Sequence, residues 1–310
     1  MKLVRYRTPD GITTGLLDGE EITALEGLSV VELLILSPAD RAARVDAARG
    51  ATVPLADAEL TAPVEQPGKF LALGFNFADH AGEQPDMSNQ TVVDLYETVR
   101  LTRAAYPSPK LPTIFNKQTS SICGPFDPVL MPEDSELLDY EGELVIVIGA
   151  HGRRLSPGQA LSIVGGYTVT NDISVRDWQW DTPTTWPGKS FDTHGPIGPC
   201  VVTADALDLS DLAIRTWVNG ELRQDSSTAA MVLDVATIVS TISQICSLQP
   251  GDLIATGTPG GIGTPTANWL KVGDVMRVEV EGIGVIENTV VAEDALGPSL
   301  PEGEWSLSRS

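Results

Sequence analysis

Three carboxylate residues in two strand-like segments could bind one divalent cation. Glu141 and Glu143 lie two residues apart in the segment LDYEGELVIVIG (138–149). Successive side chains of a strand alternate between its faces, so these two carboxylates share one face, roughly 6–7 Å apart along the chain. Asp172 ends a second strand-like segment, GYTVTND (166–172). Oxygen ligands without a neighbouring His or Cys favour Mg²⁺, Mn²⁺ or Ca²⁺ over Zn²⁺. For a bare Glu-x-Glu pair, however, the exposed strand face of an acidic protein is the commoner explanation.

A histidine and a glutamate could form a general-base pair. His80 lies in GFNFADHAGE, and Glu83 follows it by three residues. If this segment is a helical turn, both side chains lie on one face, and the carboxylate can orient the imidazole as a base that activates water. The spacing alone also fits an exposed histidine beside an acidic residue. The glycine-rich segment GTPGGIGT (257–264) is better suited to presenting backbone N–H groups to a substrate carboxylate than to binding a nucleotide.

Composition limits the partners and the compartment. The chain has 310 residues and a net charge of −22, which argues against nucleic acid or an anionic membrane as a partner. Cys123, Cys200 and Cys246 are scattered, which fits neither a disulfide framework nor a zinc site and is typical of the reducing cytoplasm. The N-terminus lacks an apolar leader, and the longest apolar runs are too short to span a bilayer. We therefore expect a cytoplasmic protein without membrane partners.

The elements that must position these residues suggest an α+β protein that is mainly β. Residues 1–65 are predicted to form a small N-terminal α+β domain, with a meander of three strands followed by two helices. The second helix should begin near Pro38 and end at Gly50. Residues 66–310 form the expected catalytic domain, in which strand-like segments dominate. Asn219-Gly220 predicts a hairpin, and DVATIVSTISQICS (234–247) is the best helix candidate of this domain.

Taken in order, several segments resemble the fumarylacetoacetate hydrolase family. They cover about 70–288, most of the chain, and they are GFNFADHAGE, IFNKQTSSICGP, DYEGELVIVIG, GYTVTNDISVRDWQ, GKSFDTHGPIGP, VNGELRQ, PGDLIATGTPGGIG and LKVGDVMRVEVEGIGVIEN. No single segment is decisive, but the ordered set is highly specific.

This resemblance implies a mixed β-roll, a Mg²⁺ or Mn²⁺ site (Ca²⁺ can take its place in a crystal), a small-molecule substrate and a homodimer. The family positions onto which residues fall are, for the metal, Glu141, Glu143 and Asp172; for the catalytic groups, His80, Glu83 and Lys189; and for substrate contacts, Arg176, Gln179 and Thr258.

Some features depart from the family pattern. The segment 84–112 is longer than usual, Gln118 stands where Pro is common, and His194 stands where many members have an aromatic residue. We expect these departures to flank the substrate rather than the metal, so they concern substrate choice.

The resemblance implies a hydrolase that cleaves a C–C bond in a 2,4-dioxo acid, an acylpyruvate, through a metal-stabilised pyruvate enolate. A lid containing residues 75–112 would exclude water. Two other readings use the same site: decarboxylation of a 2-oxo diacid such as oxaloacetate, and isomerisation of a hydroxy-diene diacid. A remote alternative is a catalytically silent metal-binding dimer.

Overall fold

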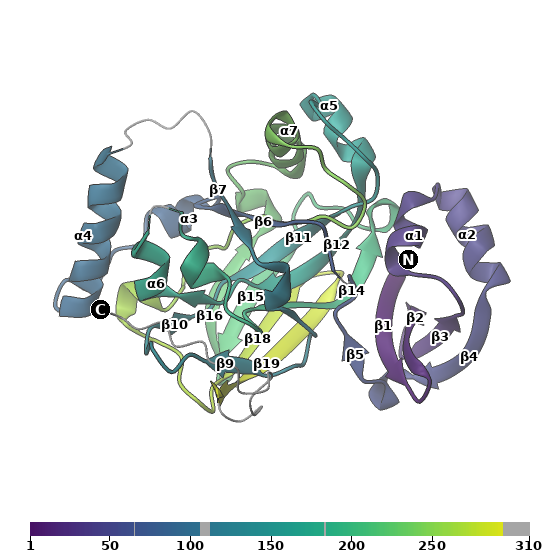
Figure 1. Cartoon of the computed structure of the whole chain (residues 1–310), viewed down its shortest axis with the longest axis horizontal. Helices are drawn as coiled ribbons and strands as arrows, with labels where there is room; N and C mark the ends of the chain where they lie inside the picture. Colours follow the sequence, from purple (N-terminus) through teal and green to yellow (C-terminus); the bar gives the residue numbers. More distant parts are fainter. Residues whose placement is uncertain (65, 106–111, 183, 294–310) are drawn as a thin grey trace, which may run out of the picture.

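A large mixed sheet runs from the N-terminal strands to the strands that carry the candidate metal ligands (Figure 1). The computed structural model describes residues 1–64, 66–105, 112–182 and 184–293. The path of this sheet is β4-β3-β2-β1-β14-β12-β11-β17-β6-β7, while β5 pairs with β1 and β8 pairs with β14. Its strands are β1 (Lys2–Thr8), β2 (Gly11–Asp18), β3 (Glu21–Leu25), β4 (Arg49–Pro54), β5 (Leu60–Thr61), β6 (Phe70–Gly74), β7 (Thr113–Lys117), β8 (Ile122–Cys123), β11 (Gly142–Ile148), β12 (Val164–Asn171), β14 (Gly195–Thr203) and β17 (Leu253–Ala255).

A second sheet packs against β11 and β12 and closes the core. Its order is β16-β15-β18-β19-β9, and a two-stranded ladder pairs β10 with β13. The strands are β9 (Val129–Met131), β10 (Leu138–Asp139), β13 (Ser174–Val175), β15 (Ala213–Val218), β16 (Glu221–Ser227), β18 (Val275–Val280) and β19 (Gly284–Ala292). Leu144 and Ile146 of β11 share one buried cluster with Ile214 and Val278 of this sheet. β11 is buried along its whole length because sheets and helices cover both of its faces, as its unbroken apolar sequence requires.

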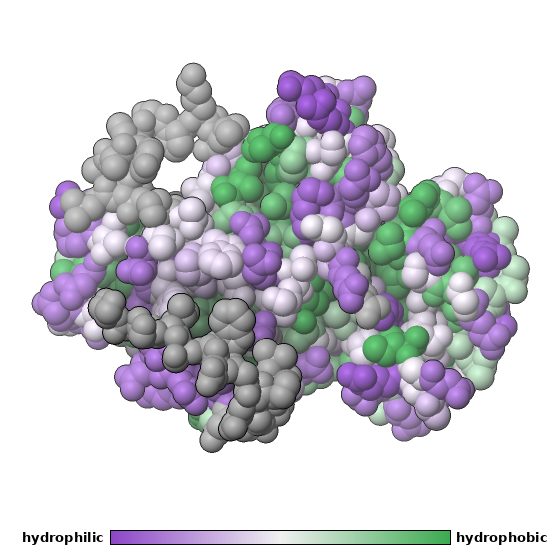
Figure 2. All heavy atoms as spheres, in the orientation of Figure 1, coloured by the Kyte–Doolittle hydropathy of each residue, from purple (hydrophilic) through white to green (hydrophobic). Residues whose placement is uncertain are grey.

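The helices are short and lie around the sheets. They are α1 (Val30–Ile35), α2 (Pro38–Ala47), α3 (Ala78–Ala81), α4 (Gln90–Ala105), α5 (Pro157–Ala160), α6 (Arg176–Trp180) and α7 (Val235–Ile245), with 3₁₀ turns η1 (Leu55–Asp57), η2 (Thr119–Ser121), η3 (Leu161–Ile163), η4 (Trp186–Lys189), η5 (Ala204–Ala206), η6 (Thr228–Ala230) and η7 (Thr264–Thr266). Figure 2 shows hydrophilic side chains over much of this view, with apolar atoms around α1 and α7, where Ile35 and Ile245 are exposed. Within the described ranges, no helix is long and apolar enough to cross a membrane. The α+β, mainly β class is confirmed.

Several local predictions agree with the structure, and one is wrong. The N-terminal meander forms, Asn219-Gly220 turns between β15 and β16 with φ of 52° and 80°, and Asp234 caps α7 by accepting the Thr237 N–H at 2.8 Å. The helix that begins at Pro38 ends at Ala47, not at Gly50. The chain leaves the helix early because Arg49 pairs with Leu25 and β4 extends the edge of the sheet.

The sheet is continuous across the expected domain boundary near residue 65. β1 pairs with β14 through Lys2↔Val202 and Leu3↔Val201. A division into 1–65 and 66–310 stays a prediction, and its last residues, 294–310, lie outside the described residues.

Candidate metal centre and active site

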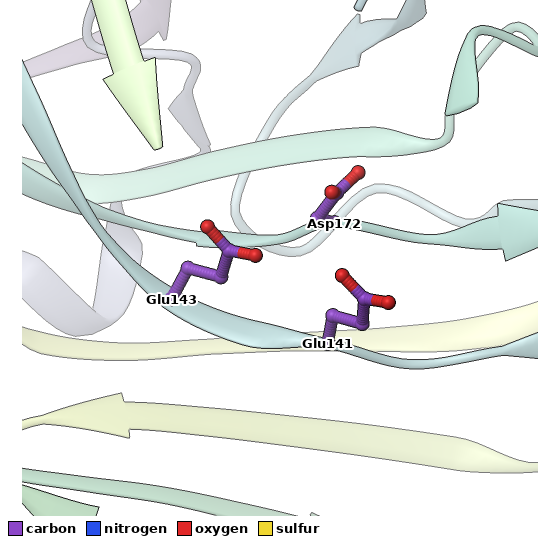
Figure 3. Close-up of side chains that lie close together, drawn as sticks. All are labelled: Glu141, Glu143 and Asp172. Atoms are coloured by element: carbon purple, nitrogen blue, oxygen red, sulfur yellow. The ribbon is translucent and has the colours of Figure 1, made fainter. Parts of the chain in front are cut away.

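The three predicted ligands meet at the ends of two neighbouring strands. Glu141 directly precedes β11, Glu143 lies in it, and Asp172 directly follows β12. Antiparallel pairing of Gly142 with Asn171 places them together, and the Asp172 N–H donates to the Glu141 carbonyl at 2.7 Å. All three side chains are buried, and their ligand oxygens lie within 4.8 Å of one another, with the carboxylates close together as Figure 3 shows.

The glycine between the two glutamates allows the sheets to pack. A side chain at Gly142 would collide with Thr216 and Val278 of the second sheet. The Gly142 N–H donates to Gln224 Oε1 at 3.0 Å, and the Glu141 N–H donates to Asn171 Oδ1 at 2.8 Å. Close packing on the glycine side therefore fixes the backbone from which both carboxylates project.

Buried cations contact two of the carboxylates. Lys189 Nζ lies 2.7 Å from Glu141 Oε2 and 2.8 Å from Asp172 Oδ2, while Lys117 Nζ lies 2.6 Å from Asp172 Oδ1. Arg176 Nη1 donates to Glu141 Oε1 at 2.6 Å. Burial by itself would raise the pKa of Glu141, but the charges of Lys189 and Arg176 outweigh it and lower that pKa to about 2.

Glu143 has the opposite environment. Its Oε2 accepts the Gly257 N–H at 2.7 Å, whereas its buried Oε1 has no hydrogen-bond partner among the described residues. Burial, and after it the negative charges of Asp172 and Glu141, raise the pKa of Glu143 well above its ordinary value. An unpartnered carboxylate oxygen facing two further carboxylates suits a hard cation, and the all-oxygen donor set fits Mg²⁺, Mn²⁺ or Ca²⁺.

His80 and Glu83 form the predicted pair. His80 lies in α3, and its Nδ1 is 2.6 Å from Glu83 Oε2. The other oxygen, Glu83 Oε1, accepts the Gly261 N–H at 2.6 Å, and Phe75 stacks on the imidazole with a centroid distance of 5.3 Å. With Nδ1 held by the carboxylate, Nε2 is the ring nitrogen that can accept a proton.

A cavity of about 300 Å³ connects Glu141 and Lys189 with the His80–Glu83 pair. The predicted site residues that line it are His80, Glu83, Glu141, Arg176, Gln179, Lys189 and Thr258. Glu143 and Asp172 do not line it, but Glu143 lies close to Glu141, and Asp172 contacts Lys189. Arg176 Nη1 also donates to Gln179 Oε1 at 2.9 Å, one α6 residue to another. The Thr258 hydroxyl donates to the Gly142 carbonyl at 3.0 Å. The structure thus brings the nine predicted residues together, while their roles stay predictions.

Three N–H groups of the glycine-rich loop contact carboxylates of the protein itself. The N–H groups of Gly257 and Gly261 donate to Glu143 and Glu83, and that of Gly263 donates to Asp139 at 2.7 Å. The protein's own carboxylates therefore accept these three N–H groups, and the approach of the loop to a substrate carboxylate stays a prediction. Through these contacts the loop links the metal-ligand side and the base side of the site.

Two buried residues at this site escaped the sequence analysis. Asp139 accepts from Thr264 N at 2.9 Å and from Arg176 Nε at 2.9 Å, in addition to Gly263 N. Lys117 holds Asp172. Both residues lie in segments that carry the family resemblance, DYEGELVIVIG and IFNKQTSSICGP. Their position in these segments is the sequence feature that could have identified them.

The positions that depart from the family pattern differ in whether they line the cavity. His194 is buried, donates from Nε2 to the Leu130 carbonyl at 2.8 Å and stacks on Phe191, and neither it nor Gln118 lines the cavity. Their expected place beside the substrate stays a prediction. The long segment 84–112 does contribute to the cavity, through α4. Of the predicted lid, residues 106–111 lie outside the described residues.

Comparison with known proteins agrees with the fold. Residues 69–291 match the family model "Fumarylacetoacetate (FAA) hydrolase C-terminal", and residues 1–63 match "Rv2993c-like, N-terminal". The chain is 36% identical to the rat protein named oxaloacetate tautomerase Fahd2a, mitochondrial, over 94% of this chain and 92% of that protein.

Two solved structures are similar to the chain in fold and sequence. Fumarylacetoacetate hydrolase from Exiguobacterium antarcticum has a TM-score of 0.76 and 34% identity, covering 94% of this chain and 99% of that one. Maleylpyruvate hydrolase from Sphingobium sp. SYK-6, in complex with manganese(II) ion and pyruvate, has a TM-score of 0.74 and 30% identity, with the same coverage. The chain belongs to the fumarylacetoacetate hydrolase family.

Proposed function

We propose that the protein is a divalent-metal-dependent hydrolase that cleaves a C–C bond in an acylpyruvate, a 2,4-dioxo acid. The observation that carries the proposal is the His80–Glu83 pair on the same cavity as Glu141 and Lys189. A base and a cation that line one cavity, beside a carboxylate trio of which Glu141 also lines it, suit water attack on the carbonyl of a bound 2,4-dioxo acid.

Glu141, Glu143 and Asp172 would hold Mg²⁺ or Mn²⁺. When bound, the ion supplies Lewis acidity to the 2-oxo acid end of the substrate. The family member from Sphingobium, which was solved with manganese and pyruvate, supports both the metal class and the product class.

The side chains account for the remaining chemistry. His80, oriented by Glu83, takes a proton from water as the water oxygen bonds to the distal carbonyl carbon. Lys189 and Gln179 donate to the oxyanion that forms there. The bond between that carbon and the methylene then breaks, its electron pair stays on the methylene carbon, and His80 returns the proton to that carbon. The products are a carboxylic acid and pyruvate, one water is consumed, and nothing is oxidised or reduced.

A second candidate reaction is tautomerisation, which transfers only protons. The 36% identity to a protein named oxaloacetate tautomerase favours keto–enol exchange of a 2-oxo diacid at the same site. A change in the enol absorbance of oxaloacetate without release of pyruvate or CO₂ identifies this reaction. Decarboxylation would instead release CO₂ and pyruvate, and diene isomerisation would change the absorbance of a diene substrate.

Pyruvate release tests the proposal. We expect the purified protein with Mg²⁺ or Mn²⁺ to release pyruvate from members of an acylpyruvate panel, and His80→Asn to lose about 100-fold or more in kcat. His151→Asn changes an exposed histidine outside the cavity and serves as the matched control. No pyruvate from any member, or equal activity of the two variants, would refute it. A homodimer and a cytoplasmic location stay predictions, to be checked by light scattering and by fractionation.

A further inference from the structure

Helix α4 forms an apolar wall of the cavity beyond the carboxylates. Leu95, Tyr96 and Val99 line the cavity. With Val92, which is fully buried, they recur at i, i+3, i+4 and i+7 and therefore share one helix face. That face is turned inward, since three of its residues line the cavity. Helix α4 contacts α6 and η7, and Figure 1 shows it beside α6.

Other elements also line the cavity with uncharged side chains. Phe115 comes from β7, Trp180 from α6, and Ile262 from the glycine-rich loop, while Leu73 and Phe75 come from the end of β6 and the residue after it. The ring centroid of Phe115 lies 5.1 Å from Lys189 Nζ and Phe75 stacks on His80, so these two rings border the charged end at Glu141 and Lys189. The apolar end lies along α4, which contacts α6, the helix of Trp180.

The cationic groups among the described lining residues lie at the charged end or are exposed to solvent. Lys189 and Arg176 contact Glu141 at the charged end. The remaining Arg or Lys among the described lining residues, Arg100, lies 2.7 Å from Glu97 and exposes 64% of its side chain. A solvent-exposed, paired guanidinium contributes little to holding a second carboxylate away from water.

We infer that the acyl substituent of the substrate is uncharged and apolar, a branched aliphatic chain or a single aromatic ring. The inference rests on the proposed function, which places the 2-oxo acid end at the carboxylate trio. A diacid would bury its second carboxylate against α4 without a dedicated cation, and it would lose hydration that nothing replaces. A volume of about 300 Å³ is at the small end for ligand cavities, so the substituent is limited to a few carbons.

A pair of substrates of matched shape tests this inference. Isocaproylpyruvate ends in an isopropyl group, and succinylpyruvate carries a carboxylate in its place. We expect calorimetry with the Mg²⁺-loaded protein to show about tenfold or tighter binding of isocaproylpyruvate, and kcat/KM to follow the same order. Equal or tighter binding of succinylpyruvate overturns the inference.

A variant of α4 tests the wall directly. Val99→Arg adds a cation at the apolar end and should shift the ratio of the two affinities toward succinylpyruvate by about tenfold. Thr91→Arg adds the same charge at an exposed position of α4 that does not line the cavity, and it should leave the ratio unchanged. The same ratio for both variants would overturn the inference.

Binding and turnover separate the two proposals. Preferential binding of isocaproylpyruvate without pyruvate release supports the apolar wall and refutes hydrolysis. Pyruvate release from both compounds with no preference supports hydrolysis and refutes the apolar wall.

Discussion

The environment of Glu143 leads to a prediction about stability. Glu143→Gln should stabilise the metal-free protein, and it should reduce the stabilisation that metal provides. Glu143→Gln keeps the shape of the side chain and removes its charge. In metal-free protein the wild-type carboxylate is buried, has one unpartnered oxygen and faces Asp172 and Glu141. The amide can still accept the Gly257 N–H, and its NH₂ group can donate to the neighbouring carboxylates. We expect the variant to be more stable than the wild type by about 1–3 kcal/mol at pH 8 in EDTA.

The pH dependence of this difference has a fixed sign. Because the pKa of Glu143 is raised on folding, the folded protein holds a proton that the unfolded chain releases. Unfolding is therefore favoured as the pH rises above the ordinary glutamate pKa. The advantage of the variant should widen between pH 5 and pH 8.

Metal should stabilise the wild type more than the variant, and it reverses their order of stability where the advantage of the variant in EDTA is below about 2.3 kcal/mol. At a metal concentration about 100 times the dissociation constant, the wild type gains about 2.7 kcal/mol. If the loss of one anionic ligand weakens binding about 100-fold, the variant gains only about 0.4 kcal/mol.

Urea unfolding followed by tryptophan fluorescence, in EDTA and in Mg²⁺ or Mn²⁺, measures both effects. Glu287→Gln changes an exposed glutamate of β19 and is the control. A variant less stable than the wild type in EDTA, or one stabilised by metal as much as the wild type, would refute the reasoning.

Three further predictions concern single side chains. Asp139→Asn leaves buried Arg176 without one carboxylate partner, and urea unfolding should show a loss of about 3–5 kcal/mol; a loss below about 1 kcal/mol would contradict this. Burial lowers the pKa of His194 to about 3, so unfolding, which lets it bind a proton, is favoured as the pH falls below about 6.5. Between pH 7 and pH 5 the wild type should therefore lose about 2 kcal/mol more than His194→Phe, and equal losses would exclude His194 as the cause. Asp234→Ala removes the cap of α7 and should cost about 1 kcal/mol, while Asp234→Asn, which can still accept from Thr237, should cost less.

Local patterns in the sequence determined much of the fold and the candidate ligands. Alternation along a strand placed Glu141 and Glu143 on one face, Asn219-Gly220 specified a hairpin, and Asp234 marked the start of α7. These features depend on residues close together in the chain, so spacing and side-chain chemistry suffice to predict them. The ordered segments of the resemblance then linked Asp172, His80 and Lys189 to the same site.

Only the tertiary structure decided which groups the carboxylates contact. Lys117, Asp139 and the glycine-rich loop reach the site through strand pairing and sheet packing between residues up to 178 positions apart. His194 illustrates the same limit, since its burial under Leu130 and Phe191 cannot be derived from its neighbours in sequence. Long-range contacts of this kind set the pKa difference between Glu141 and Glu143, because electrostatic energies in a buried site depend on distances in space rather than along the chain.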